Sequence, residues 1–168
     1  AIFGDFLAQA PQRRTLVGSS IGSWRFASIL AWGAKEGTER LSELYINLYF
    51  HKKMSRHDVG NICRGMLIDL IQGKEQQLVN HPDYHLAVIS IKAQHIFQSD
   101  QALPLLASVA GIIGSNALGR KHNRLFMQRV ISQPSSGQQF KVIDDFVTHY
   151  QSLNQDNAIP WLMASASI

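Results

Sequence analysis

The feature that most constrains this chain is a short apolar run followed by a serine between two glycines. Thr15-Leu16-Val17 is continuously apolar and partly β-branched, a pattern typical of a strand buried in a parallel sheet. Gly18-Ser19-Ser20-Ile21-Gly22 comes next, and helical spacing begins within the following residues. This order of strand, Gly-x-Ser-x-Gly and helix predicts a tight turn that presents Ser20 at the carboxyl end of the strand.

Both glycines have a predicted steric role in this turn. A strained serine between a strand and a helix requires Gly18 and Gly22, because a Cβ atom at either position would crowd the neighbouring backbone. The turn also places the Ser20 oxygen near the positive end of the helix dipole, which favours the negative charge that develops during attack on an ester. The pattern therefore predicts Ser20 as a nucleophile and Gly18 and Gly22 as the glycines of its elbow.

Two other interpretations of the turn remain open. The segment would also fit an ordinary turn in which Ser19 or Ser20 caps the helix. A loop of small residues that opens a helix can also bind phosphate. However, the chain has neither a Gly-Lys-Ser or Gly-Lys-Thr ending nor the spacing Gly-x-Gly-x-x-Gly at this point. The strand and the helix on either side favour the nucleophile.

Helical spacing and strand-like runs alternate along the rest of the chain. Helices are predicted over 20–32 with Gly33 as its stop, over 38–53, from a cap at Ser55 to near Gly73, over 103–118 and over 157–168. The helix over 38–53 has an apolar stripe made of Leu41, Leu44, Tyr45, Leu48 and Tyr49. Strands are predicted over 86–91, at the centre of the sheet, over 129–132 and over 140–153. This order predicts an α/β fold in which helices cover both faces of the sheet.

The composition predicts one folded domain over residues 1–168. Hydrophobic residues make up 45% and charged residues 17% of the 168, which excludes intrinsic disorder. Cys63 is the single cysteine, so the chain can form neither an intrachain disulfide nor a cysteine-rich zinc module. A reducing compartment fits best, and we expect a cytoplasmic protein that uses neither a metal nor a cofactor.

The charge does not require a polyanionic partner. Sixteen Lys and Arg against twelve Asp and Glu give a net charge of +4, which is too mild to demand a nucleic acid but suits an anionic membrane surface. The densest basic segment, 119–124, is interpreted as a solvated loop. Because it lies beside the apolar run 103–118, it would also help the protein sit at the periphery of such a membrane. The run is shorter than the roughly 20 residues that span a bilayer, and it predicts a buried helix.

Three segments occur in an order that resembles the patatin-like phospholipases. They are the elbow from Gly18 to Gly22, the strand over 86–91 and the closing Ala164-Ser165-Ala166-Ser167-Ile168. In that family a helix rich in Ala and Ser, often ending Ser-Ile-Pro, comes shortly before an Asp-Gly-Gly or Asp-Gly-Ala motif. The resemblance implies a three-layer α/β/α fold and a serine–aspartate dyad that hydrolyses fatty acyl esters of lipids without a histidine.

The resemblance assigns the nucleophile but not its base. Ser20 matches the family's serine, whereas the family's glycine-rich oxyanion loop has no match in 1–17. No aspartate is followed by glycine, and this holds for all eight: Asp5, Asp58, Asp69, Asp83, Asp100, Asp144, Asp145 and Asp156. We therefore expect a partial patatin-like domain, truncated at both ends, whose partner Asp lies outside this chain and which is inactive as a piece.

An esterase with a Ser-His-Asp triad is the closest enzymatic alternative. The order Ser, acid, His found in α/β-hydrolases would place His149 after Asp144 or Asp145. Spacing does not select among the seven histidines, which are His51, His57, His81, His85, His95, His122 and His149. A nonenzymatic interaction domain also remains open, because a serine without a partner base is a poor nucleophile.

Overall fold

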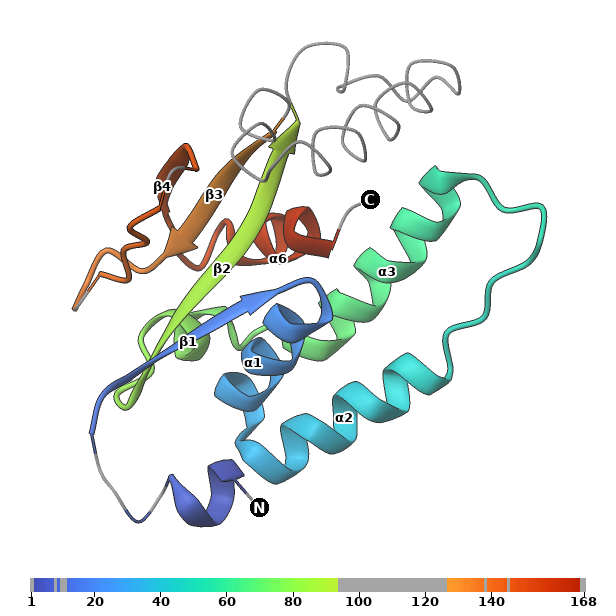
Figure 1. Cartoon of the computed structure of the whole chain (residues 1–168). Helices are drawn as coiled ribbons and strands as arrows, with labels where there is room; N and C mark the ends of the chain where they lie inside the picture. Colours follow the sequence, from blue (N-terminus) through green and yellow to red (C-terminus); the bar gives the residue numbers. More distant parts are fainter. Residues whose placement is uncertain are drawn as a thin grey trace.

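A four-stranded mixed sheet runs through the protein, of which a computed structural model describes residues 2–7, 9, 12–93, 127–137, 139–144 and 146–166. The strands are β1 (Arg14–Ser19), β2 (Tyr84–Ala93), β3 (Met127–Gln133) and β4 (Thr148–Ser152), and they lie in this order across the sheet. β1 is parallel to β2, β2 is antiparallel to β3, and β3 is parallel to β4 (Figure 1). The prediction of a central strand at 86–91 is therefore confirmed by β2.

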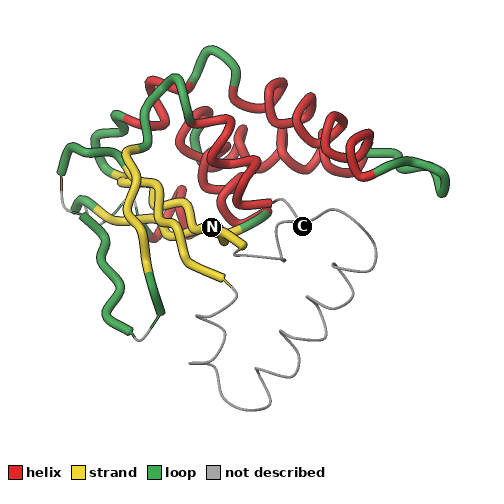
Figure 2. Tube along the Cα trace, turned by 90° about the horizontal axis from the view of Figure 1, so that it is seen from above, coloured by secondary structure: helices red, strands yellow, loops and turns green. Residues whose placement is uncertain are grey.

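Five α-helices fall within the described residues, and most of them lie on one side of the sheet in Figure 2. They are α1 (Ile21–Trp32), α2 (Ala34–Ile46), α3 (Arg56–Ile71), α4 (Glu75–Val79) and α6 (Ala158–Ala166), and a short helical turn, η1 (Ile2–Phe6), precedes β1. The mixed α/β class is thus confirmed. The predicted helix over 103–118 and the basic segment 119–124 lie outside the described residues.

Local signals placed several helix ends correctly. Gly33 ends α1 with a φ of 84°, a conformation that glycine adopts without a Cβ penalty. At the start of α3, the Ser55 Oγ accepts the Asp58 N–H at 3.2 Å and the Asp58 carboxylate accepts the Ser55 N–H at 2.9 Å. This reciprocal pair is a capping box, so the predicted cap at Ser55 is confirmed.

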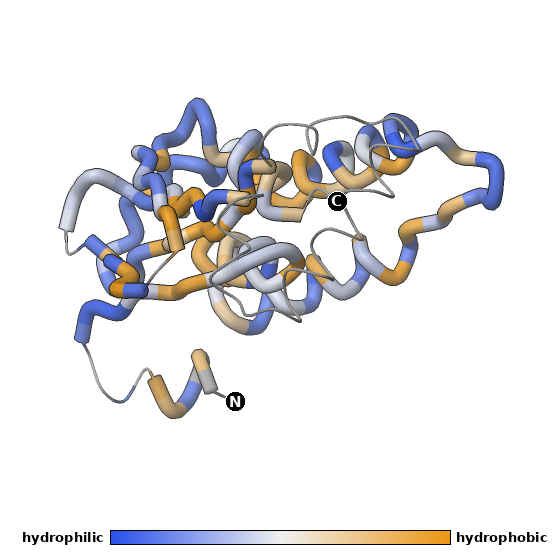
Figure 3. The backbone as a smooth tube through the Cα atoms, turned by 45° about the horizontal axis from the view of Figure 1, so that its top comes forward, coloured by the Kyte–Doolittle hydropathy of each residue, from blue (hydrophilic) through white to orange (hydrophobic). Residues whose placement is uncertain are grey.

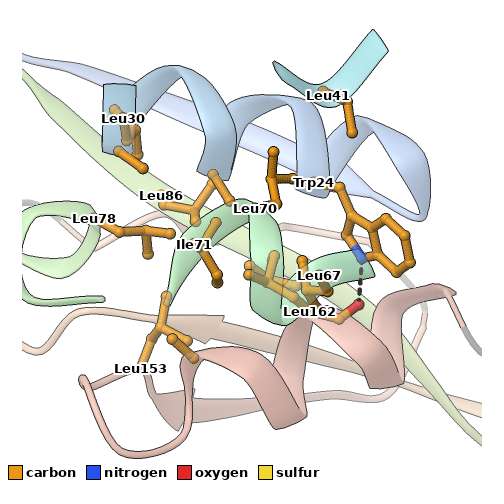
Figure 4. Close-up of a cluster of buried hydrophobic side chains, with 14 of the residues drawn as sticks. Trp24, Leu30, Leu41, Leu67, Leu70, Ile71, Leu78, Leu86, Leu153 and Leu162 are labelled. Carbon is orange, nitrogen blue, oxygen red and sulfur yellow. Dashed lines mark hydrogen bonds between the residues drawn. The ribbon is translucent and has the colours of Figure 1, made fainter. Parts of the chain in front are cut away.

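One apolar core joins the sheet to these helices. Leu16 of β1 and Leu86 of β2 face it from the sheet. The side chains drawn in Figure 4 show how the other elements contribute, namely Trp24 and Leu30 from α1, Leu41 from α2, Leu67, Leu70 and Ile71 from α3, Leu78 from α4, Leu153, and Leu162 from α6. The Trp24 indole N–H donates to the Leu162 carbonyl at 2.9 Å, the dashed line in Figure 4. The core therefore ties α1, directly after the elbow, to α6 near the end of the chain.

The predicted helix over 38–53 is wrong at both of its ends. α2 begins at Ala34 and ends at Ile46, where the Asn47 side-chain amide donates to the Glu43 carbonyl at 2.8 Å beside the last helical N–H, that of Asn47, at 3.2 Å. Such local side-chain bonds compete with continuation of a helix. The predicted stripe is also only partly buried, since Leu41 is in the core whereas Tyr45 and Tyr49 are exposed.

The predicted strand over 140–153 is wrong in its first half. Only Thr148–Ser152 joins the sheet, as β4. Before β4, the backbone of Phe140 is hydrogen-bonded to the Gln133 side chain and not to a strand. The Gln133 amide accepts the Phe140 N–H at 2.8 Å and donates to the Phe140 carbonyl at 3.1 Å. The Asp144 carboxylate accepts the Phe146 N–H at 3.0 Å, which gives the backbone a local alternative to strand pairing.

Candidate active site

Ser20 has a strained backbone at the junction of β1 and α1. Its φ is 53° and its ψ is −136°, and it is the only non-glycine residue with a positive φ in the described part of the chain. β1 ends at Ser19 and α1 begins at Ile21, so a single residue turns the chain from strand to helix. A residue in such a sparsely populated region costs about 1 to 3 kcal/mol, and such residues cluster at functional sites.

Gly18 and Gly22, on either side of Ser20, differ in the space available for a side chain. A Cβ atom on Gly18 would lie 2.7 Å from the Cα and 2.8 Å from the backbone nitrogen of Ser23, so its predicted steric role is confirmed. A Cβ atom on Gly22 would meet nothing within 4 Å. The steric role predicted for Gly22 is therefore wrong, because Gly22 lies inside α1 on a side with open space.

The backbone of Ser20 is held on both sides by hydrogen bonds. Its carbonyl accepts the Ser23 N–H at 2.9 Å and the Ser23 hydroxyl at 2.6 Å. Its N–H donates to the Ser165 Oγ at 2.9 Å and lies 3.2 Å from the Ser165 carbonyl. The Ser165 hydroxyl donates in turn to the Ile89 carbonyl at 2.6 Å. Ser165 of α6 thus links the elbow to β2.

The hydroxyl of Ser20, in contrast, takes no part in the described part of the fold. Ser20 is exposed, and within the described residues its Oγ neither caps α1 nor has a hydrogen-bond partner. This argues against the ordinary turn in which the Ser20 side chain caps the helix. α1 has no acidic residue in its first turn, so the positive end of its dipole beside Ser20 is not neutralised locally.

A pocket of about 350 Å³ opens between α1 and α2, starting at the residue after Ser20. Ile21 and Arg25 of α1 line one side. Thr38, Leu41, Ser42, Tyr45 and Ile46 line it from α2. Ligand pockets are mostly apolar with a few polar groups that fix orientation, and this lining has that character. The sequence does not predict this pocket, although helical spacing places Ile21 and Arg25 on one face of α1.

The strand order separates the best-placed histidine from Ser20. His149 pairs with Val130 in β4, three strands away from β1, which corresponds to about 14 Å across the sheet. Its Nε2 lies 2.8 Å from the Gln128 Oε1, and Asp144 forms an ion pair with Arg129 at 2.9 Å. The residues proposed for a triad are therefore not brought together with Ser20, and Asp145 lies outside the described residues.

The other described histidines also lie away from the elbow or serve local structure. His85 pairs with Thr15, five positions before Ser20 in β1, which is about 16 Å along the strand. Burial and the nearby Arg13 charge lower the pKa of His85, and contact with Gln133 opposes them. His57 bonds Asn61 on α3 at 3.1 Å, and His81 precedes β2 at the same end of the sheet as His85. His51 meets the Tyr49 ring edge to face, while His95 and His122 lie outside the described residues.

The link through Ser165 leads to a testable expectation. The Ser165→Ala variant loses the hydroxyl that accepts the Ser20 N–H and donates to the Ile89 carbonyl, and a hydrogen bond of this kind contributes about 0.5 to 1.5 kcal/mol. We expect its thermal midpoint to fall by a few degrees. Ser19→Ala is the matched control, because Ser19 is exposed and its hydroxyl has no hydrogen bond in the described structure. Equal melting of the two variants would show that Ser165 does not hold the elbow.

No known relative adds to this geometry. No family model, curated protein or solved structure matches the chain significantly. Over the described residues, no three His, Cys, Asp or Glu side chains are grouped so that they could hold a metal ion. No helix in the same part of the chain is long and apolar enough to cross a membrane.

Proposed function

We propose that this protein is a serine hydrolase of lipid acyl esters, similar to the patatin-like phospholipases, with Ser20 as the nucleophile. One observation carries the proposal, namely the strained and exposed Ser20 between a parallel strand and a helix, with a hydroxyl that the described fold does not use. An ordinary turn would relieve the strain with a glycine, so the serine at this position indicates chemistry.

The reaction divides into two steps at Ser20. The Ser20 oxygen attacks the acyl carbonyl while its proton passes to a base, the alcohol leaves with a proton, and water then hydrolyses the acyl-serine ester. In this proposal, backbone N–H groups at the start of α1, led by that of Ile21, stabilise the oxyanion. The pocket between α1 and α2 starts beside the elbow and would receive the acyl chain.

We propose that the base is a carboxylate that follows α6 in the full-length protein. Support comes from Ser165, which bonds the Ser20 N–H at 2.9 Å and so brings the end of α6 to the elbow. In this proposal a glycine-rich segment before residue 1 completes the oxyanion site, and helices on both faces give the three-layer α/β/α fold. The distance from Ser20 to His149 favours this dyad over a Ser-His-Asp triad.

We also propose that the protein acts in the cytoplasm, because a chain with a single cysteine suits a reducing compartment. Cys63 is the single cysteine, and partial burial raises the pKa of its thiol. A thiol with a raised pKa is mostly protonated and unreactive at neutral pH, so Cys63 does not compete with Ser20 as a nucleophile.

Labelling with a fluorophosphonate probe tests the assignment without knowledge of the substrate. We expect the full-length protein to bind one probe molecule on the peptide that contains Ser20, because only a serine with a partner base reacts at a useful rate. Ser20→Ala should take up no label, and Ser19→Ala should be labelled like the wild type. Absence of labelling in the folded full-length protein, or labelling at another residue, would contradict the proposed nucleophile.

A further inference from the structure

A group of large apolar side chains is exposed where α2 ends. Tyr45 and Ile46 close the helix, and Tyr49 and Phe50 follow it. Their exposed fractions are 53%, 77%, 70% and 46%. We call these four residues the α2 patch. Single exposed apolar residues are ordinary on a protein surface, but four large ones within six positions of the chain make this segment a candidate interaction surface.

The α2 patch is directly followed by positive charge. Lys52, Lys53 and Arg56 are exposed in the segment before α3, and no acidic residue occurs between positions 44 and 57. Figure 3 shows this change, since the tube is orange near the end of α2 and deep blue at the outermost bend of the connection to α3. The nearest following acid, Asp58, is engaged with Ser55 in the capping box. We call 51–57 the basic loop.

The position of the α2 patch connects it to the elbow. Tyr45 and Ile46 belong to the patch and also line the pocket between α1 and α2. The same pocket begins at Ile21, the residue that follows Ser20. The pocket therefore extends from the exposed end of α2 to the residue that follows the candidate nucleophile.

The tyrosines and lysines of the α2 patch and the basic loop favour a lipid surface over a protein as the partner. Tyrosine prefers the boundary between lipid headgroups and acyl chains, where its ring is buried and its hydroxyl stays hydrated. Lysine is depleted in protein–protein interfaces, whereas beside a membrane it lays its alkyl stem on apolar surface and keeps its charge at the headgroups. Two adjacent lysines next to two tyrosines thus favour lipid.

We propose that the α2 patch and the basic loop form a docking surface for an anionic phospholipid bilayer. Ile46 and Phe50 enter the boundary between headgroups and acyl chains, the two tyrosines lie at headgroup level, and Lys52, Lys53 and Arg56 contact the anionic headgroups. The docked orientation brings the mouth of the pocket to the bilayer. Docking goes beyond the proposed hydrolysis and does not depend on it, because no part of this surface is the nucleophile.

Sedimentation of the full-length protein with vesicles tests this surface. We expect binding to vesicles of phosphatidylcholine mixed with phosphatidylserine, weak binding to phosphatidylcholine alone, and a loss of binding as salt rises. The double variant Lys52→Glu/Lys53→Glu should weaken binding to the anionic vesicles by more than about tenfold. Tyr49→Ser/Phe50→Ser should weaken it to a similar extent, because the anchoring rings are lost.

Matched controls lie at the opposite end of the molecule. Lys141→Glu and Ile143→Ser change one exposed lysine and one fully exposed isoleucine between β3 and β4, far from the connection between α2 and α3 in Figure 1. Both should bind vesicles like the wild type. All variants change exposed side chains, so each should melt near the wild-type temperature.

Several results would overturn the docking surface. One is that the wild type binds neither type of vesicle. Another is that the basic-loop and control variants bind equally well. A third is that the wild type is a dimer, does not bind vesicles, and becomes a monomer in Tyr49→Ser/Phe50→Ser, which would assign the α2 patch to a second copy of the chain. Ser20→Ala should bind vesicles normally, so failure of the nucleophile assignment would leave docking intact.

Discussion

Ser20→Ala should reduce the turnover of acyl esters by the full-length protein by several orders of magnitude, on the order of 10⁶-fold, as loss of the nucleophile does in other serine hydrolases. Its stability should not change. The exposed Ser20 hydroxyl makes no hydrogen bond in the described structure, and alanine keeps the Cβ atom that strains the turn. Release of p-nitrophenol from an acyl ester and thermal melting measure the two quantities.

Ser20→Gly is the matched variant that separates chemistry from strain. It also lacks the hydroxyl, so it should be as inactive as Ser20→Ala. A glycine, however, accepts φ 53° and ψ −136° without a Cβ clash, which removes about 1 to 3 kcal/mol of strain. After the roughly 0.5 to 1 kcal/mol that glycine's extra freedom in the unfolded chain costs, Ser20→Gly should melt above Ser20→Ala. Residual turnover in Ser20→Ala would disprove the nucleophile, and a Ser20→Gly variant that melts lower would disprove the strain.

Gly18→Ala and Gly22→Ala should change stability in opposite directions although they lie four residues apart. The new Cβ at Gly18 would sit 2.7 Å from the Ser23 Cα and 3.0 Å from the Gly22 carbonyl carbon, and both of these are backbone atoms that cannot rotate away. Overpacking of this kind costs about 1 to 3 kcal/mol or more. At Gly22 the added methyl group has open space and lies inside α1, where alanine is favoured over glycine by about 0.5 to 1 kcal/mol.

The reactivity of Ser20 should differ between Gly18→Ala and Gly22→Ala for the same steric reason. Gly18→Ala must displace the first turn of α1 from β1, so it should lose most fluorophosphonate labelling. Gly22→Ala should be labelled like the wild type and melt slightly higher. If the two variants melt at the same temperature, β1 and α1 do not approach each other as closely as the described backbone indicates.

Features that depend on neighbouring residues could be predicted from the sequence. The apolar run 15–17, Gly18 and the capping pair Ser55 and Asp58 each place their own backbone, so the first strand, the turn at Ser20 and the start of α3 were predicted correctly. The central strand was also predictable, because a continuous apolar run favours a strand with partners on both sides. Local steric and hydrogen-bonding preferences are sufficient for these features.

Features that depend on distant residues could not be predicted. Periodicity over 38–53 indicated an apolar stripe, but whether Tyr45 and Tyr49 are covered depends on which elements pack against α2. Residues 140–147 have strand-forming residues, yet the Gln133 side chain takes the backbone partners of Phe140. Gly22 matched the motif, but only the packing around α1 showed that its Cβ position is open.

The same distinction between neighbouring and distant residues applies to the candidate site. The sequence alone determined that a serine would stand in a tight turn between a strand and a helix, because the strand, the glycine at position 18 and the helix are adjacent in the chain. Only the tertiary structure placed Ser165 against Ser20, put His149 three strands away and opened a pocket between α1 and α2. The physical reason is that contacts between residues far apart in the chain follow from strand order and helix packing, which the whole core determines together.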